Sequence, residues 1–254
     1  EMCIRDSGGS LRIPGAFNSV VGLRPSTGRV PRGLRHPFGA SMFGSLYAEG
    51  PIARNVDDLA LFLDVLAKQH PEEPYSFPPP AESYASQARR TPSSIRVAYS
   101  ENLGITPVAR EVTEVCATAM ERLAGPGVTI EERTPDFRHA VDAFQVLRAA
   151  YFASDHQVHL RENRDQLKPE VIWNIEKGLA LTAAEIGAAE GQRARLCASL
   201  MSVFEDVDVV VCPTAIVAPF DVDVRYVEEV EGQRFDNYIP VSYTHLRAHE
   251  TSTY

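Results

Sequence analysis

The order of the predicted elements favours an α/β fold, with a mixed, largely parallel central sheet covered by helices on both faces. Residues 95–99 alternate as a strand, a helix is predicted near 109–124, and residues 128–130 form a second strand. Two strands joined by a helix of this length are expected to run parallel, with a right-handed crossover. Val207 to Cys212 is apolar except for Asp208, which predicts a strand buried on both faces.

The part of the chain before this sheet contains one clear helix. Residues 8–50 are punctuated by glycine and proline, which predicts loops and turns with short strands at most. Asn55 is a good N-cap, Asp57 and Asp58 fall in the first turn, and apolar residues then repeat at helical spacing. Residues 71–94 hold six prolines and predict an extended surface connection, which is neither a helix nor a core strand.

Three further helices are predicted after the second strand, near 137–166, 169–178 and 182–205. Pro169 stands at a first-turn position, where its missing N–H costs nothing. Thr182 and Glu185 have the spacing of a capping box. The region therefore predicts helices that cover the sheet.

Composition excludes several classes of protein. Of the 254 residues, 44% are hydrophobic and 23% charged, which is typical of a globular chain. The formal charge of −9 argues against nucleic acid as a partner, and no apolar stretch is long enough to predict a membrane span. The cysteines are widely separated without zinc spacing, and no secretory leader is visible, so we expect reduced thiols, a cytoplasmic location and no metal or cofactor. His156 and His159 are expected on a solvated helix face.

The two ends of the chain differ in composition from the sequence between them. Residues 1–6, and residues 241–254 (VSYTHLRAHETSTY), resemble translated sequencing-adapter sequence. We therefore expect a partial domain over residues 7–240, with the proline-rich connection inside it, and non-native ends on both sides. The authentic piece is expected to be an internal fragment of a longer protein.

The residues most informative about chemistry are Asp6-Ser7-Gly8-Gly9-Ser10-Leu11-Arg12. Two adjacent glycines allow positive φ, so that successive backbone N–H groups can converge on one point. Such a group of donors can stabilise the oxyanion of an acyl-transfer reaction, with the Ser10 hydroxyl at its rim. Asp6 and Arg12 are expected to pair across the turn and to hold it rigid. A Gly-Gly-Ser loop taken alone is common in proteins of many kinds.

A longer set of motifs, which includes this loop, indicates a particular protein family. GGSLRIPGAFNSVVGLRPSTGRVP, followed after a gap by EGPIARNVDDLALFLDVLA, resembles the amidase signature family. The later VDVVVCPT and Phe235-Asp-Asn-Tyr238 segments follow in the order that the family shows, so the resemblance covers residues 6 to 240. It implies the α/β fold of that family, here incomplete.

The resemblance implies a serine hydrolase that cleaves a carboxylic amide into an acid and ammonia or an amine. Members use a Ser–Ser–Lys triad, in which a lysine acts as base through a bridging serine. Ser10 matches the nucleophile, and Ser7, Gly8 and Gly9 match the oxyanion-hole residues. The lysine and the bridging serine lie upstream of this motif in the family, and only nine residues precede Ser10 here. We therefore expect a small-molecule amide as substrate of the intact protein, and no activity from this chain alone.

Two other functions remain open. The chain is also similar to the glutamine-dependent amidotransferase component that amidates mischarged transfer RNA, although residues 41–49 do not resemble that component, and a non-catalytic scaffold protein is the third hypothesis. Cys212 is expected to be a buried small side chain and not a thiol nucleophile. Trp173 is expected in the core or in the wall of a substrate channel, and the acidic run from Asp221 to Glu231 in an exposed segment.

Overall fold

A three-stranded parallel sheet forms the core of the C-terminal part. The computed structural model describes residues 3–6, 8–31 and 46–239, with side chains from residue 8 onward. Strand β4 (Ile95–Tyr99) lies between β5 (Val128–Glu132) and β6 (Val209–Val211), and both pairs are parallel. Val97 and Ala98 of the central strand are almost fully buried. The predicted β-α-β unit is confirmed.

A second, antiparallel sheet carries the N-terminal part. Strand β3 (Ala48–Ala53) lies between β1 (Cys3–Asp6) and β2 (Val21–Gly22). The α/β class is confirmed, but the described strands form separate parallel and antiparallel sheets where the sequence predicts one mixed, largely parallel sheet. Residues 8–50 were expected to lack helices, but Arg12–Phe17 form helix α1. Pro14 and Gly15 obscure this helix in the sequence, although Pro14 falls in its first turn, where proline is tolerated.

The predicted helix after Asn55 is confirmed as α2 (Val56–Leu66). The Asn55 side chain accepts a hydrogen bond of 2.8 Å from the backbone N–H of Asp58. The proline-rich segment after it is mostly exposed, but contains the four-residue helix α3 (Tyr84–Gln87), where the sequence predicted no helix. Ser83 caps this helix, and the Asp64 carboxylate of α2 accepts from the N–H groups of Tyr84 and Ala85. These local bonds make a short helix stable in a segment that composition describes as extended.

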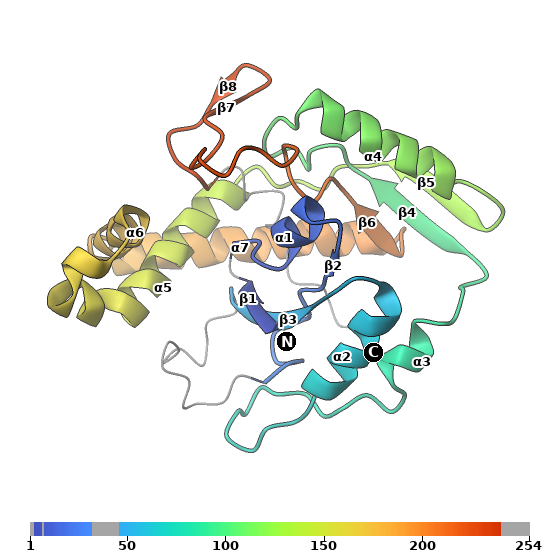
Figure 1. The fold of residues 1–254 in the computed structure, drawn as a ribbon, viewed down its shortest axis with the longest axis horizontal. Coiled ribbons are helices and arrows are strands. Elements are labelled where there is room, and N and C mark those ends of the chain that lie inside the picture. The colour runs from blue at the N-terminus through green and yellow to red at the C-terminus, as the bar shows by residue number, and fades with distance from the viewer. Residues whose placement is uncertain (1–2, 7, 32–45, 240–254) are drawn as a thin grey trace.

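The remaining helices cover the parallel sheet and extend beyond it (Figure 1). They are α4 (Arg110–Leu123), α5 (Ala140–Glu162), the 3₁₀ turn η1 (Arg164–Gln166), α6 (Pro169–Leu179) and α7 (Ala183–Phe204). Both predicted start signals are confirmed, with Pro169 as the first residue of α6 and the capping box of Thr182 and Glu185 at α7. Helix α6 approaches α5 so closely at Gly178 that an added Cβ would lie 1.9 Å from the carbonyl oxygen of Ala149.

Strand β6 corrects one prediction. It is an outer strand of the described sheet, and Val209 is 38% exposed, so the strand is not buried on both faces. The apolar run predicts a strand covered on both faces, whereas Val209 is partly open to solvent. Asp208, just before the strand, accepts hydrogen bonds from the backbone N–H and the guanidinium of Arg96, which fastens β6 to β4.

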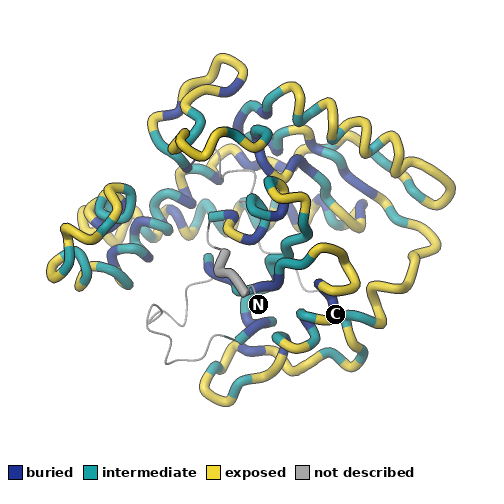
Figure 2. Tube along the Cα trace, viewed as in Figure 1, coloured by how far each residue is buried: buried dark blue, intermediate teal, exposed yellow. Residues whose placement is uncertain are grey.

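Among the strands, buried residues lie mainly in β3 and β4, and among the helices they are most numerous in α5 (Figure 2). The acidic segment after Asp221 is exposed, as predicted, and ends in a hairpin of β7 (Glu229–Val230) and β8 (Gln233–Arg234). Glu231 and Gly232 both have positive φ, as a tight hairpin turn of this kind requires. No described helix is long and apolar enough to cross a membrane.

Candidate active site

The Gly8–Ser10 loop connects the N-terminal sheet to α1. Gly9 has φ +94°, a conformation that favours glycine. Its carbonyl oxygen accepts hydrogen bonds of 3.0 Å and 2.8 Å from the N–H groups of Arg12 and Ile13, which turn the chain into α1. Ser10 is exposed and Leu11 is fully buried. The turn therefore leaves the Ser10 hydroxyl accessible and anchors the chain one residue later.

Gly22 and Gly50, later in the motif, leave room for the backbone and side chain of Leu11. An added Cβ at Gly22 would lie 2.0 Å from the carbonyl oxygen of Leu11. An added Cβ at Gly50 would lie 2.1 Å from the carbonyl oxygen of Leu23 and 3.1 Å from Cδ1 of Leu11. No larger residue fits at these two positions without a shift of the backbone. The glycines of the motif therefore fix the position of the residue that follows Ser10.

The structure brings part of the predicted constellation together. Gly8, Gly9 and Ser10 share one loop, and Arg12 is the first residue of α1. Asp6 is the last residue of β1, opposite Ala48, and its pairing with Arg12 stays a prediction. Ser7 lies outside the described residues. The convergence of its backbone N–H with those of the two glycines also stays a prediction.

A cluster that the sequence did not predict lies beside this loop. Nη1 of Arg148, on α5, lies 3.5 Å from the position that a Cβ on Gly8 would occupy. Nη2 of the same guanidinium donates to the hydroxyl oxygen of Tyr238 at 2.7 Å, and Nδ2 of Asn174 donates to that oxygen at 3.2 Å. Asn174 is 1% exposed. One available signal was the position of Arg148 on the face of α5 that also carries Phe144, Leu147 and Tyr151.

Three aromatic rings surround the Arg148 guanidinium. Its carbon lies 5.0 Å from the ring centroid of Phe152, 5.4 Å from that of Tyr238 and 5.8 Å from that of Phe144. A cation over aromatic faces is attracted by their quadrupoles. Within the described residues no carboxylate forms an ion pair with Arg148.

Lys177, on α6, is a further cation that contacts α5. Burial lowers the pKa of its ammonium group. Its Nζ donates to Oε1 of Gln145 at 2.7 Å and lies 5.1 Å from the ring centroid of Trp173. These contacts hold it between α5 and α6, and none of them is with the Gly8–Ser10 loop.

The other candidates behave as expected or carry no chemistry. Cys212 is 8% exposed and packs in an apolar cluster, which confirms its interpretation as a buried small side chain. Trp173 is 38% exposed, so it is not a core residue. His156 and His159 are half-buried, so the expected solvated helix face is only partly right. Their rings are 6.1 Å apart, and the described residues contain no group of side chains able to hold a metal ion.

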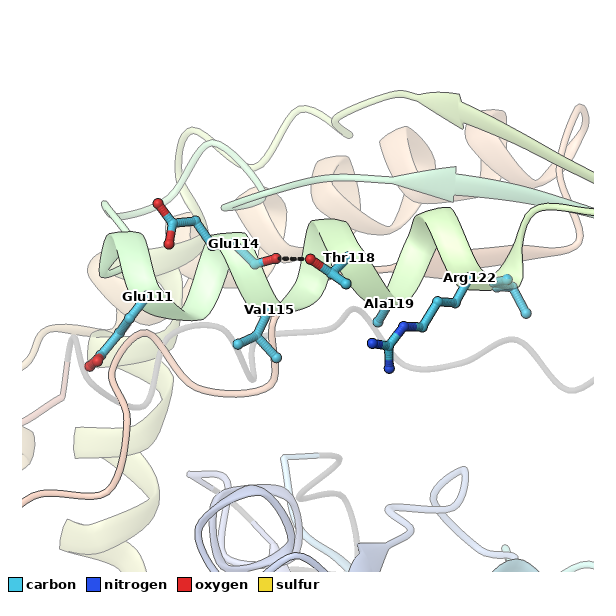
Figure 3. Close-up of a pocket in the computed structure, with 7 residues that line it drawn as sticks. Glu111, Glu114, Val115, Thr118, Ala119 and Arg122 are labelled. Atoms are coloured by element: carbon cyan, nitrogen blue, oxygen red, sulfur yellow. Dashed lines mark hydrogen bonds between the residues drawn. The ribbon is translucent and has the colours of Figure 1, made fainter.

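A shallow hollow follows the outer face of α4 (Figure 3). Every residue that lines it belongs to that one helix: Glu111, Glu114, Val115, Thr118, Ala119, Arg122 and Leu123. The Thr118 hydroxyl donates to the carbonyl oxygen of Glu114, an ordinary bond within a helix. Ser10 and its neighbours in the Gly8–Ser10 loop are not among the residues that line this hollow.

Comparison with known families identifies the chain. The family model described as Amidase matches residues 5–252. The chain belongs to the amidase family. The resemblance drawn from the Gly-Gly-Ser motif and its successors is therefore confirmed.

Amidase relatives of several kinds match this chain. An acylamidase of Rhodococcus erythropolis is 32% identical over 217 residues, which cover 85% of this chain and 45% of the relative. An amidase of Pseudomonas putida is 29% identical, over 82% of this chain and 44% of the relative. A glutamyl-tRNA(Gln) amidotransferase component of Lysinibacillus sphaericus is 30% identical, over 85% of this chain and 49% of the relative. The chain spans about half the length of these curated amidase relatives.

Solved amidase structures share the fold. A bacterial aryl acylamidase of the amidase signature family has a TM-score of 0.84 at 23% identity, covering 96% of this chain and 52% of that one. A 6-aminohexanoate cyclic dimer hydrolase has a TM-score of 0.80 at 19% identity, covering 96% of this chain and 54% of that one. These likenesses confirm the fold and do not identify a substrate.

Proposed function

We propose that this chain is the part of a serine amidase that carries the nucleophile, Ser10. The observation that carries the proposal is the Gly8–Ser10 turn, in which Gly9 adopts positive φ, Ser10 is exposed and Leu11 is buried. A nucleophile must be accessible, and donors to an oxyanion must be held in place before charge develops. Both requirements fit this turn.

In the proposed reaction, Ser10 Oγ attacks the carbonyl carbon of an amide while a base takes its proton. The carbonyl oxygen becomes an oxyanion, which the N–H groups of Ser7, Gly8 and Gly9 stabilise. Collapse breaks the C–N bond, the leaving nitrogen takes a proton, and ammonia or an amine departs. Water then opens the acyl-enzyme to a carboxylic acid and frees the serine hydroxyl.

The base is proposed to lie upstream of this chain. The family's lysine and bridging serine precede the Gly-Gly-Ser motif, and the nine residues before Ser10 include no lysine. A serine hydroxyl without a base is a weak nucleophile at neutral pH. We therefore expect that the 254-residue chain alone does not turn over amides, and that a longer protein carrying it does.

The experiment compares Ser10→Ala with a matched Ser94→Ala variant in the longer protein. Ser94 is exposed in the loop before β4, away from the nucleophile turn. Release of ammonia or aniline from simple alkyl and aryl amides is measured. Ser10→Ala is expected to lower kcat by about 10³-fold or more, while Ser94→Ala keeps the parent rate. Full activity of Ser10→Ala would show that the nucleophile lies elsewhere.

Amidation of mischarged transfer RNA is the second candidate, because the amidotransferase component of Lysinibacillus sphaericus is nearly as similar as the acylamidase. That function requires glutamine as the ammonia donor and partner proteins. Glutamine-dependent amidation of glutamyl-tRNA, seen only when such partners are added, would favour it over simple amide hydrolysis.

A further inference from the structure

Arg148 has more hydrogen-bonding capacity than the described structure uses. A guanidinium has five N–H donors, and one of them is used here, in the bond from Nη2 to Tyr238. The Nε atom is buried and has no acceptor. Leaving a buried donor unpaired is costly, and proteins retain such groups where a ligand supplies the partner.

The charge of Arg148 is also unbalanced. Among the described residues no carboxylate pairs with it, and its neighbours are the rings of Phe144, Phe152 and Tyr238. Asp155, seven residues further along α5, lies about 10 Å away along the helix axis at 1.5 Å per residue. Both of its carboxylate oxygens are buried without a hydrogen-bond partner, so it does not neutralise Arg148.

The guanidinium is held in one orientation. Tyr238 accepts from both Arg148 and Asn174, and Asn174 is itself fixed by a 2.7 Å bond from its Nδ2 to the carbonyl oxygen of Glu170. The Tyr238 oxygen thus bridges α5 to α6. A fork held in this way binds a planar carboxylate with little further loss of side-chain freedom.

The position of Arg148 relates this capacity to the reaction. Nη1 lies 3.5 Å from the Cβ position of Gly8, two residues before the proposed nucleophile. A group bound to this edge of the guanidinium is therefore close to the amide that Ser10 attacks. A side chain on Gly8 would contact this edge of the guanidinium, so glycine leaves room beside it.

We propose that Arg148 is a specificity-determining residue that binds a carboxylate carried by the amide substrate within a few bonds of the scissile carbonyl. The proposal rests on the proposed function and deepens it by naming the substrate class, anionic amides. The carboxylate can belong to the acyl part or to the amine part of the substrate, and the two are separated by the choice of probe.

The test uses two isosteric substrate pairs with the longer, active protein. Succinamate against 4-methylpentanamide places the charge on the acyl side, and N-acetylglycine against N-isobutylacetamide places it on the amine side. We expect the parent to prefer the charged member of at least one pair. Arg148→Gln is expected to reduce that preference about tenfold or more in kcat/KM, and to leave the neutral member within about threefold.

Three controls separate the alternatives. Arg110→Gln removes an exposed arginine of α4, paired with Glu114. We expect it to leave the charged-to-neutral ratio of kcat/KM unchanged in both substrate pairs. Arg148→Lys keeps the charge without the fork and is expected to retain part of the preference. In the Ser10→Ala background, calorimetric binding of the preferred charged amide is expected to be lost with Arg148→Gln, which gives a readout that needs no turnover.

The outcomes are distinguishable. An equal loss for charged and neutral amides, or a parent with no preference in either pair, would overturn the proposal and leave Arg148 as a support for the loop. If Ser10→Ala keeps full activity, the proposed function fails, whatever Arg148→Gln does. If Arg148→Gln lowers the charged-to-neutral ratio of kcat/KM and leaves turnover of the neutral amide unchanged, both the proposed function and the role of Arg148 are supported.

Discussion

Gly178 tests how closely α5 and α6 must approach. Gly178→Ala would place a Cβ 1.9 Å from the carbonyl oxygen of Ala149 and 2.8 Å from the Cβ of Ala153. Ordinary contact begins at 3.4 Å, so the helices must separate by about 1.5 Å at this point. Overpacking of this kind costs about 1–3 kcal/mol, and here the obstacle is backbone, which cannot rotate away.

Gly187→Ala in α7 is the matched control. Nothing lies within 4 Å of the Cβ that it would add. Alanine is favoured over glycine in a helix interior by about 0.5–1 kcal/mol, so this variant is expected to gain stability. The two substitutions are chemically identical, but we expect them to change the free energy of unfolding in opposite directions. Their expected difference in free energy of unfolding is about 1.5–4 kcal/mol.

The assay is urea denaturation of the 254-residue chain, followed by far-ultraviolet circular dichroism. Gly178→Ala is expected to shift the midpoint to lower urea with an unchanged slope, and Gly187→Ala to shift it to higher urea. Because α6 carries Asn174, separation of the helices also weakens the bond of Asn174 to Tyr238. Equal stability of the parent and Gly178→Ala would refute the close approach of the two helices.

Three further predictions concern local bonds. Asn55→Ala removes the cap of α2 and is expected to cost about 1 kcal/mol, seen as a melting temperature about 2–4 °C lower; an unchanged melting temperature would contradict the cap. Hydrogen bonds from the backbone N–H and the hydroxyl of Thr182 lower the pKa of Glu185, and Thr182→Ala removes only the hydroxyl, so carbon-13 NMR should show that pKa rising part of the way toward its ordinary value. Hydrogen bonds from Arg138 lower the pKa of Asp136 from 3.8 to about 2, and Arg138→Gln should raise it. Because the folded-state pKa is depressed, the Asp136–Arg138 contribution to stability is present at neutral pH and is lost as the pH falls from about 4 toward 2; a carboxyl that titrates normally in the parent would contradict the bond.

Helices with strong local signals are predicted well from this sequence. Asn55, Pro169 and the Thr182–Glu185 pair act on their own neighbours, so the bonds they form depend little on the rest of the fold. The β4–α4–β5 unit is predicted for a similar reason, because a helical crossover between two strands leaves few geometries open.

The errors arise where distant contacts decide the outcome. Helix α3 exists because Asp64, 20 residues earlier in the chain, accepts two of its N–H groups. The exposure of Val209 depends on which strands flank β6, which an apolar run does not specify. In both cases the composition of the segment is read correctly, but it does not reveal which distant residues contact the segment.

The candidate site divides in the same way. The Gly8–Ser10 loop is contiguous, and its motif is visible in the sequence. The Arg148–Tyr238 bond joins residues 90 positions apart, and Asn174 reaches the same oxygen from 64 positions away. Nothing local marks Tyr238 as the acceptor of two donors. This pairing depends on how α5, α6 and the segment that carries Tyr238 pack together.

The glycines of the motif explain why its spacing is informative. Gly9 provides the backbone conformation of the loop, while Gly22 and Gly50 act at a distance, by leaving room for Leu11 and its carbonyl oxygen. A Gly-Gly-Ser triplet without those two later glycines lacks the space in which the residue after the serine is buried. The position of the Ser10 hydroxyl therefore depends on packing that extends from the loop to Gly50, and substitution of Gly22 or Gly50 is expected to displace the nucleophile without touching it.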